Sequence, residues 1–244
     1  MSCLIVIPAR MGSTRFPGKP LCDLLGKPMV RWVYEAAVDA AVGRVVVATP
    51  DPEIIQACRG FSAEAVLTRY DHPTGTDRIA EVAAQIEADV YVNVQGDEPL
   101  IPPSSIAACA SLLLDRPEVL MGSVFCRCES DEYDQASVVK VVTDASGYAL
   151  YFSRYAIPFP RNDRVAPVKK HLGLYAYRRS ALLDFAGWTP SPLEVAESLE
   201  QLRFMENGVR ILMTEAAGAE LAVDTPEQAE EVRRILAERV GTIM

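Results

Sequence analysis

A short stretch near the N-terminus combines positive charge, hydroxyl groups and glycine. It precedes the first carboxylate of the chain, Asp23, so it holds three basic residues and no acidic one in a chain of formal net charge −9. Backbone amides exposed at glycines, together with cations and hydroxyl donors, form the kind of site that binds a polyphosphate. The residues concerned are Arg10, Gly12, Ser13, Thr14, Arg15, Gly18 and Lys19.

The spacing of these residues matches neither of the two common phosphate-binding fingerprints, G-x-G-x-x-G and G-x-x-x-x-G-K-[ST]. A mobile basic loop is the alternative interpretation. Prolines, glycines and like charges directly after an apolar run favour an ordered binding site over a mobile loop. The stretch therefore indicates a phosphate site of another type.

Two aspartates have the chemistry to hold a metal ion on that phosphate. Asp97 follows the apolar run Val90–Val94 and Gly96, and Asp224 stands before Pro226, where a helix is expected to begin. Mg²⁺ is commonly held by one or two carboxylates, phosphate oxygens and water. A turn is an equal alternative for Asp97, and on spacing alone a helix N-cap is the favoured interpretation of Asp224.

The segment Thr68–Arg78 leads into another expected helix. Backbone amides at a helix start, with Arg78 nearby, could contact a base or a phosphate. The alternative is an ordinary capped helix start, with Thr74 or Thr76 as the cap, and the two interpretations are compatible. We interpret His72 as a surface loop residue.

The second half carries polar residues that suit a polyhydroxylated acid. Arginine and histidine can bind a carboxylate, while amide and carboxylate groups can bind hydroxyls. Surface charge is the alternative for each residue taken singly. The residues concerned are Arg154, Arg161, His171, Tyr175, Glu200 and Gln201.

Alternating strands and helices are expected to position these residues. In the first 115 residues, buried strand-like runs alternate with stretches of helical periodicity, which indicates a parallel sheet covered by helices on both faces. Ligands of such sheets bind beyond the carboxyl ends of the strands, here after Ile7 and Val94. The expected strands are Ser2–Ile7, Arg44–Ala48, Ala63–Thr68 and Val90–Val94, and the expected helices Met29–Ala40, Glu53–Cys58, Asp77–Glu87 and Ser104–Leu114.

The second half is richer in strands, and no linker separates it. We therefore predict one domain over residues 1–244, with a strand-rich subdomain inserted at about 119–178. Asp144–Gly147 is a turn signal between two strands, which predicts a hairpin. The expected strands are Val119–Phe125, Val138–Thr143, Tyr148–Phe152, His171–Tyr177 and Val209–Thr214, and the expected helices Ser180–Phe185, Pro192–Met205 and Pro226–Val240.

Composition narrows the class of protein. Hydrophobic residues make up 50% of the chain and charged residues 23%, which is enough for a substantial core. The net negative charge argues against a general nucleic-acid-binding surface. The N-terminal apolar run is too short to span a membrane and lacks the features of a secretion signal. We expect a cytoplasmic protein, with no membrane insertion, whose six cysteines are mostly buried and reduced.

Several motifs together resemble those of one family. Arg-x-x-Ser-Thr-Arg-x-Pro-Gly-Lys-Pro from Arg10, Val-Gln-Gly-Asp-Glu-Pro from Val94 and Val-Asp-Thr-Pro-Glu from Val223 are similar to the signatures of the sugar-nucleotidyltransferases. Tyr-Phe-Ser-Arg, His-Leu-Gly-x-Tyr and Leu-Glu-Gln-Leu-Arg resemble the acceptor segments of the 3-deoxy-manno-octulosonate (KDO) cytidylyltransferases. The resemblance extends from about residue 3 to 238.

The resemblance implies a Rossmann-like fold of the nucleotide-diphospho-sugar transferase type, usually a homodimer formed through second-half strands. It implies transfer of CMP from CTP to KDO, for lipopolysaccharide precursor synthesis, with Mg²⁺ on Asp97 and Asp224. Lys19, Arg10 and Asp97 would be catalytic. CTP would contact Pro8, Ala9, Arg10, Met11, Ser13, Thr14, Arg15, Lys19, Arg69, Gly75, Thr76, Arg78 and Gln95. The acceptor would contact Gln95, Arg154, Arg161, His171, Tyr175, Glu200 and Gln201.

Two alternatives remain at this point. The same chemistry could act on another small acid, such as an amino-sugar analogue or a phosphonate, and the residues of the second half would decide between acceptors. A protein of another class, a catalytically silent nucleotide-binding protein, could have kept the same pocket. Its catalytic residues would then be expected to be lost, whereas Lys19, Asp97 and Asp224 are all present.

Overall fold

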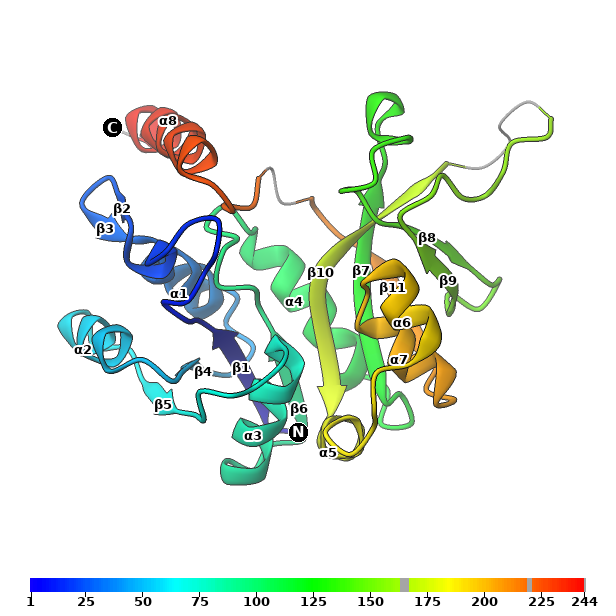
Figure 1. Cartoon of the computed structure of the whole chain (residues 1–244), viewed down its shortest axis with the longest axis horizontal. Coiled ribbons are helices and arrows are strands. Elements are labelled where there is room, and N and C mark those ends of the chain that lie inside the picture. The colour runs from blue at the N-terminus through cyan, green and yellow to red at the C-terminus, as the bar shows by residue number, and fades with distance from the viewer. Residues whose placement is uncertain (163–166, 219–220, 244) are drawn as a thin grey trace.

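A twisted sheet runs through the whole molecule in the computed structural model, which describes residues 1–162, 167–218 and 221–243 (Figure 1). The strand order of its main path is β5-β4-β1-β6-β10-β7-β11. Neighbouring strands are parallel except at β10, which is antiparallel to both β6 and β7. These strands are β1 Cys3–Pro8, β4 Arg44–Thr49, β5 Ala65–Leu67, β6 Val90–Asn93, β7 Met121–Arg127, β10 Lys169–Arg178 and β11 Ile211–Glu215.

Helices cover both faces of this sheet because both faces of its strands are apolar. In β1, Cys3, Ile5 and Ile7 join the core on one face, while Leu4 and Val6 join the core on the other. The predicted α/β fold with a mostly parallel sheet is therefore confirmed. The first face is covered by α1 Met29–Asp39, α2 Pro52–Gly60 and α4 Pro103–Leu114, and the second by α3 Gly75–Gln85, α5 Arg179–Phe185 and α7 Gln201–Glu206.

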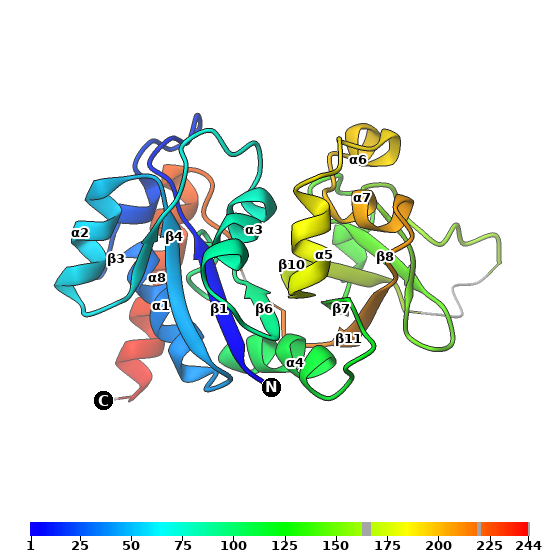
Figure 2. The same ribbon diagram turned by 90° about the horizontal axis from the view of Figure 1, so that it is seen from below.

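The predicted hairpin of the second half is also present. It consists of β8 (Lys140–Thr143) and β9 (Ala149–Ser153), and β8 pairs with the first residues of β10. The Asp144 carboxylate closes the turn by accepting hydrogen bonds from the amides of Ser146 and Tyr148, each at 2.9 Å. This hairpin lies at the opposite end of the molecule from α2 (Figures 1 and 2).

The prediction of one helix over Pro192–Met205 was wrong. The segment forms two short helices, α6 (Pro192–Glu197) and α7, separated at Ser198, whose φ is 53°. Arg154 explains the break, because its Nε donates to the Glu197 carbonyl oxygen at 2.7 Å. Its backbone amide also binds the Glu197 carboxylate at 2.9 Å. The chain therefore turns after α6 and brings Glu200 and Gln201 to the start of α7.

The final helix, α8 (Pro226–Ile243), returns to the N-terminal half. Its Val232 and Leu236 share a core with Leu24 and Met29, from β2 (Asp23–Leu24) and the start of α1. Figures 1 and 2 both show α8, in red, at the same end of the molecule as α1. This packing brings the segment before α8 next to the loop that follows β1. That loop contains a short 3-10 helix at Lys19–Leu21, and β2 pairs with β3 (Lys27–Pro28).

Two expectations from composition concerned membrane insertion and the state of the cysteines. None of the helices in the described part of the chain combines the length and the apolar character needed to cross a membrane. All six cysteines are free; Cys22 and Cys126 are partly exposed and the other four are buried.

Candidate active site

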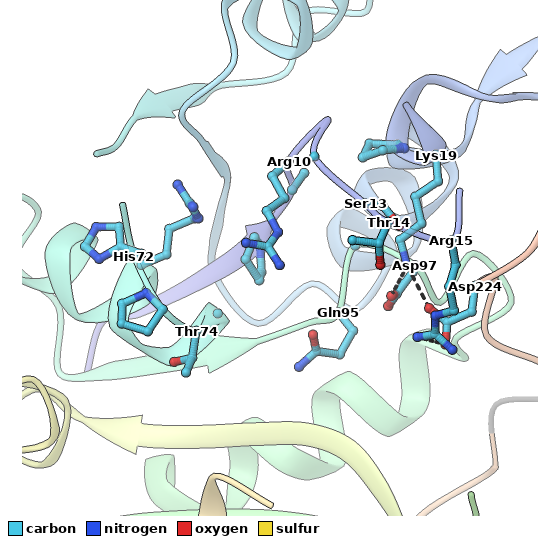
Figure 3. A pocket seen from close by; sticks show the side chains of 18 residues that line it. Arg10, Ser13, Thr14, Arg15, Lys19, His72, Thr74, Gln95, Asp97 and Asp224 are labelled. Carbon is cyan, nitrogen blue, oxygen red and sulfur yellow. Dashed lines mark hydrogen bonds and ion pairs between the residues drawn. The ribbon is translucent and has the colours of Figure 1, made fainter. Parts of the chain in front are cut away.

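Three residues from distant parts of the chain meet at the carboxyl edge of the sheet. The Lys19 ammonium lies 2.6 Å from Asp97 Oδ2 and 3.1 Å from Asp224 Oδ1. Lys19 follows β1, Asp97 follows β6 and Asp224 precedes α8. Figure 3 shows both carboxylates turned toward the end of the Lys19 side chain. Arg15 adds a second cation, 3.0 Å from Asp224 Oδ2.

Main-chain hydrogen bonds hold the two acidic segments together. The Val223 amide donates to the Asp97 carbonyl oxygen at 2.8 Å, and Lys19 Nζ donates to the Val223 carbonyl oxygen at 3.1 Å. Gln228 Oε1 accepts from the Asp224 amide at 2.7 Å. The Thr225 hydroxyl accepts from the Gln228 amide at 3.4 Å, so these two residues cap α8. The Asp224 carboxylate is therefore not used in capping and can contact Lys19 and Arg15.

Sequence reasoning missed Gln228 as a positioning residue. The signal was available, since Thr225 and Gln228 have the spacing of a capping box.

The two cations, Lys19 and Arg15, balance the charges of the two carboxylates, Asp97 and Asp224. Burial lowers the pKa of Lys19, but the charges of Asp97 and Asp224 and their hydrogen bonds outweigh it, so its pKa is raised and the ammonium stays charged. The described residues contain no group of three or more His, Cys, Asp or Glu side chains arranged to hold a metal. Two converging carboxylates nevertheless fit Mg²⁺, which takes its remaining ligands from phosphate and water.

The loop after β1 is fixed at its beginning and closely approached by a second loop. The Met11 amide donates to Asp51 Oδ2 at 2.7 Å, and the Met11 carbonyl oxygen accepts from the amide of Gly18 at 3.0 Å. A Cβ at Gly96 would lie 2.6 Å from the Pro8 carbonyl oxygen, so only glycine allows this approach. Asp51 was not singled out from the sequence, where an Asp before a helix indicates only an N-cap.

A cleft of about 340 Å³ opens beside the lysine and the two carboxylates. Lys19, Asp97 and Asp224 lie at one end in Figure 3, His72 and Thr74 lie at the other, and Arg10 lies between them. The walls come from the loop after β1, the start of α3 and the loop after β6. Of the residues expected to bind CTP, Pro8, Ala9, Arg10, Ser13, Thr14, Arg15, Lys19, Gly75, Arg78 and Gln95 line this cleft.

The other residues expected to contact CTP lie elsewhere. Arg69 pairs with Asp71 at 2.6 Å and lines a second groove beside α5. Thr76 is 4% exposed on α3, and the side chain of Met11 packs against the core. His72 is less exposed than expected for a surface residue, because its ring packs against the Glu81 carboxylate.

Arg10 and Arg78 line the cleft, and among the described residues no carboxylate is hydrogen-bonded to either guanidinium. Burial, and then the nearby charge of Arg10, lower the pKa of Arg78. Arg78 also supports the wall, since its guanidinium donates to the Arg69 carbonyl oxygen at 3.0 Å and to the Thr68 hydroxyl. A pair of like charges of this kind favours an anionic ligand.

Most residues expected to contact the acceptor gather over β10. The Tyr175 hydroxyl donates to Gln201 Oε1 at 3.1 Å, and the His171 and Tyr175 ring centroids are 5.3 Å apart. Glu200 lies near the hydroxyls of Thr76 and of Thr74 in the cleft wall; burial raises its pKa, and these hydroxyls offset the rise only in part. Glu200 therefore joins this cluster to the cleft.

Arg154 and Arg161, which were also expected to contact the acceptor, have different surroundings from the residues over β10. The Arg154 guanidinium donates to the carbonyl oxygens of Glu197 at 2.7 Å, Ala136 at 3.0 Å and Ser198 at 3.3 Å. Arg161 is exposed, and within the described residues no hydrogen bond or ion pair joins its guanidinium to the cluster.

Ser123 and Glu98 were missed by sequence reasoning. The Ser123 hydroxyl lies 3.0 Å from His171 Nε2 and donates to the Leu174 carbonyl oxygen at 2.8 Å. Burial, and then the charge of Asp97, raise the pKa of Glu98 to about 7. A Cβ at Gly173 would lie 3.4 Å from Glu98 Oε1, which places this carboxyl beside β10. Serine inside a strand and glutamate after an aspartate carry no distinctive sequence signal.

His171 should make stability depend on pH. Burial lowers its pKa to about 3 from an ordinary value of 6.5. Between these values the unfolded chain binds a proton that the folded chain excludes, so this contribution to stability is present above pH 6.5 and is lost as the pH falls. From pH 6.5 to 5, we expect the free energy of unfolding to fall by roughly 1.5 kcal/mol more in the wild type than in His171→Gln. Guanidinium chloride unfolding at both pH values measures this, and equal losses would contradict it.

Comparison with known proteins identifies the family. A family model for cytidylyltransferases matches residues 4–211. The chain is 50% identical over 246 residues to 3-deoxy-manno-octulosonate cytidylyltransferase of Geobacter sulfurreducens, with 95% of this chain and 98% of that protein covered. The chain belongs to the 3-deoxy-manno-octulosonate cytidylyltransferase family. The family member of Escherichia coli is 46% identical, with 98% and 97% of the two chains covered.

Solved structures agree with this membership. The structure of CMP:2-keto-3-deoxy-manno-octonic acid synthetase complexed with CTP has a TM-score of 0.95 and 45% identity to this cytidylyltransferase, and covers 98% of this chain and 100% of that one. A putative glucose-1-phosphate thymidylyltransferase from Bacillus anthracis shares the fold, with a TM-score of 0.68, 11% identity and 96% and 95% of the two chains covered.

Proposed function

We propose that this cytidylyltransferase uses Mg²⁺ and transfers CMP from CTP to KDO, which releases pyrophosphate and supplies an activated sugar for lipopolysaccharide. The observation that carries the proposal is the meeting of Lys19, Asp97 and Asp224 beside a cleft lined by arginines. A relative of 45% identity that was solved with CTP supports the choice of nucleotide.

The triphosphate of CTP would bind the loop after β1. Arg10, Arg15 and Lys19 supply positive charge, and Ser13 and Thr14 supply hydroxyl donors. The nucleoside would occupy the end of the cleft near Arg78 and Gly75. Met11, Arg69 and Thr76 do not line the cleft, and their contact with CTP stays a prediction.

Asp97 and Asp224 would hold Mg²⁺, with the phosphates as further ligands. When bound, the ion neutralises phosphate charge and favours in-line displacement at the α-phosphorus. Lys19, which donates to both carboxylates, would hold them in position and add charge at the phosphates.

The acceptor would bind over β10, against His171, Tyr175, Glu200 and Gln201, with Gln95 between it and CTP. Arg154 uses three of its five N–H donors on carbonyl oxygens, which leaves two for the acceptor carboxylate. Arg161 would meet the same carboxylate.

The reaction itself would be an in-line displacement at phosphorus. The acceptor hydroxyl oxygen forms a bond to the α-phosphorus, the bond from this phosphorus to the bridging oxygen of the β-phosphate breaks, and pyrophosphate leaves. The hydroxyl proton passes to solvent. Positioning and electrostatic stabilisation would supply the acceleration, without a covalent enzyme intermediate.

A homodimer formed through the strand-rich part at about 119–178 is part of this proposal. Three large apolar side chains there are strongly exposed: Leu150 at 59%, Tyr155 at 84% and Phe159 at 83%. Exposed apolar groups that cluster along one segment favour contact with another chain. We place the enzyme in the cytoplasm, where CTP is available.

Pyrophosphate release tests the proposed function. We expect release only when CTP, Mg²⁺ and KDO are all present, with each omitted in turn as the control. CTP binding without release with KDO would contradict the acceptor assignment, and amino-sugar acids and phosphonates would then be assayed. CTP binding without release with any acid would indicate a silent nucleotide-binding protein.

A further inference from the structure

Tyr70 is an exposed aromatic residue beside the cleft. Its surface is 76% exposed, yet its hydroxyl lies against the loop after β1, where a Cβ at Gly12 would be 3.7 Å from the Tyr70 oxygen. Gly12 lines one wall of the cleft, and His72 and Pro73, just after Tyr70, line the facing wall. Tyr70 therefore connects the two walls on the side open to solvent.

The residues on both sides of Tyr70 are anchored to α3. The Arg69 amide donates to Glu81 Oε2 at 2.9 Å, and the Arg69 carbonyl oxygen accepts from Arg78 at 3.0 Å. The ring of His72 contacts the same Glu81 carboxylate. The fold thus sets the position of this tyrosine, although the side chain itself packs little against the protein.

The contacted loop is anchored as well. The amide of Met11, which precedes Gly12, donates to Asp51, and the amide of Ser13 donates to the Met11 carbonyl oxygen at 3.0 Å. The Tyr70 segment and the loop after β1 are thus both anchored where they approach each other. An aromatic ring that bridges them while exposed has surface available to cover a ligand.

The ligand chemistry follows from the place of Tyr70 in the cleft. His72, two residues after Tyr70, lies at the end of the cleft opposite Asp97 and Asp224 (Figure 3), which is the end where the proposed function places the nucleoside. Aromatic side chains stack on nucleobases, and a tyrosine can do so while its hydroxyl stays hydrogen-bonded or hydrated.

We propose that Tyr70 forms the outer wall of the cleft and that its ring packs against the nucleoside of bound CTP. This inference rests on the proposed function, because it assumes that CTP occupies the cleft. It predicts that the ring contributes to CTP affinity and to slow CTP release, and leaves the chemical step unchanged.

Calorimetric titration with CTP and Mg²⁺, without acceptor, tests this. We expect Tyr70→Ala to raise the Kd for CTP by about 5- to 30-fold, since loss of one stacked aromatic has effects of this order. Tyr70→Phe keeps the ring and should stay within about threefold of the wild type. Leu67→Ala, which removes a 59% exposed side chain from β5, is the matched control and should not change the Kd.

Steady-state kinetics give a second readout. In Tyr70→Ala, the KM for CTP should rise while kcat and the KM for the acceptor stay within about twofold, and circular dichroism should show an unchanged fold. If the wild type binds CTP and Tyr70→Ala binds it equally well, this inference is overturned and the proposed function stands. An equal loss in Tyr70→Phe would overturn packing by the ring. Absence of CTP binding by the wild type would instead overturn the proposed function.

Discussion

Replacement of Asp97 by asparagine should lower the rate of pyrophosphate release by about 1,000-fold, because a charged metal ligand is worth several kcal/mol in the transition state. Asparagine has the same size as aspartate, so the contact with Lys19 and the fold should persist. The lost charge weakens the pair of carboxylates that would hold Mg²⁺. Pyrophosphate release at saturating CTP and KDO measures the effect.

Asp39→Asn is a suitable control, because it removes one negative charge from the exposed end of α1, far from the cleft. Its rate should equal that of the wild type. Isothermal titration with Mn²⁺ and CTP adds a readout that does not depend on turnover, and the affinity for the ion should fall in Asp97→Asn alone. A variant that retains more than a tenth of the wild-type rate would exclude Asp97 as a metal ligand.

The second large effect is expected from Gly96→Ala. The added Cβ would lie 2.6 Å from the Pro8 carbonyl oxygen, and the neighbouring Ala9 amide is bonded to Ala48 at 2.9 Å, so β1 cannot easily yield. The loop that carries Asp97 is therefore expected to shift relative to Lys19. A displacement near 1 Å can lower kcat about 100-fold, and overpacking typically costs about 1–3 kcal/mol of stability.

Gly60→Ala provides the matched control for Gly96→Ala. Gly60 ends α2, its φ is not positive and no atom lies within 4 Å of an added Cβ. Alanine there should preserve activity and leave stability unchanged or raise it by up to about 1 kcal/mol. Thermal unfolding and kcat of both variants are compared per folded molecule. Wild-type kcat in Gly96→Ala would show that the two loops can separate without harm to the site.

Much of the architecture could be predicted from local patterns. Runs such as Val90–Val94 and periodic stretches such as Met29–Ala40 correspond to β6 and α1 within a residue or two, because burial on one or both faces leaves a regular imprint. The helix break at Ser198 could not be predicted in this way. It depends on Arg154, more than 40 residues earlier, which binds the Glu197 carbonyl oxygen.

Local pattern also determined which chemistry the cleft could hold. The sequence shows a run of cations and glycines after β1 and aspartates at 97 and 224. These residues could be singled out because they stand at the ends of predicted strands and helices. Spacing alone nevertheless favoured a helix cap for Asp224. The tertiary structure decided otherwise, since Thr225 and Gln228 cap α8 and leave the Asp224 carboxylate beside Lys19, 205 positions earlier.

The sequence by itself therefore determined the sheet, the covering helices and the kinds of groups at the strand ends, because these follow from local polarity and periodicity. Only the tertiary structure decided that α8 returns Asp224 to Lys19, that Arg69 pairs with Asp71 beside a second groove and that Tyr70 reaches Gly12. Side-chain directions and contacts between distant segments depend on how helices pack on the sheet, and no short window of sequence contains that information.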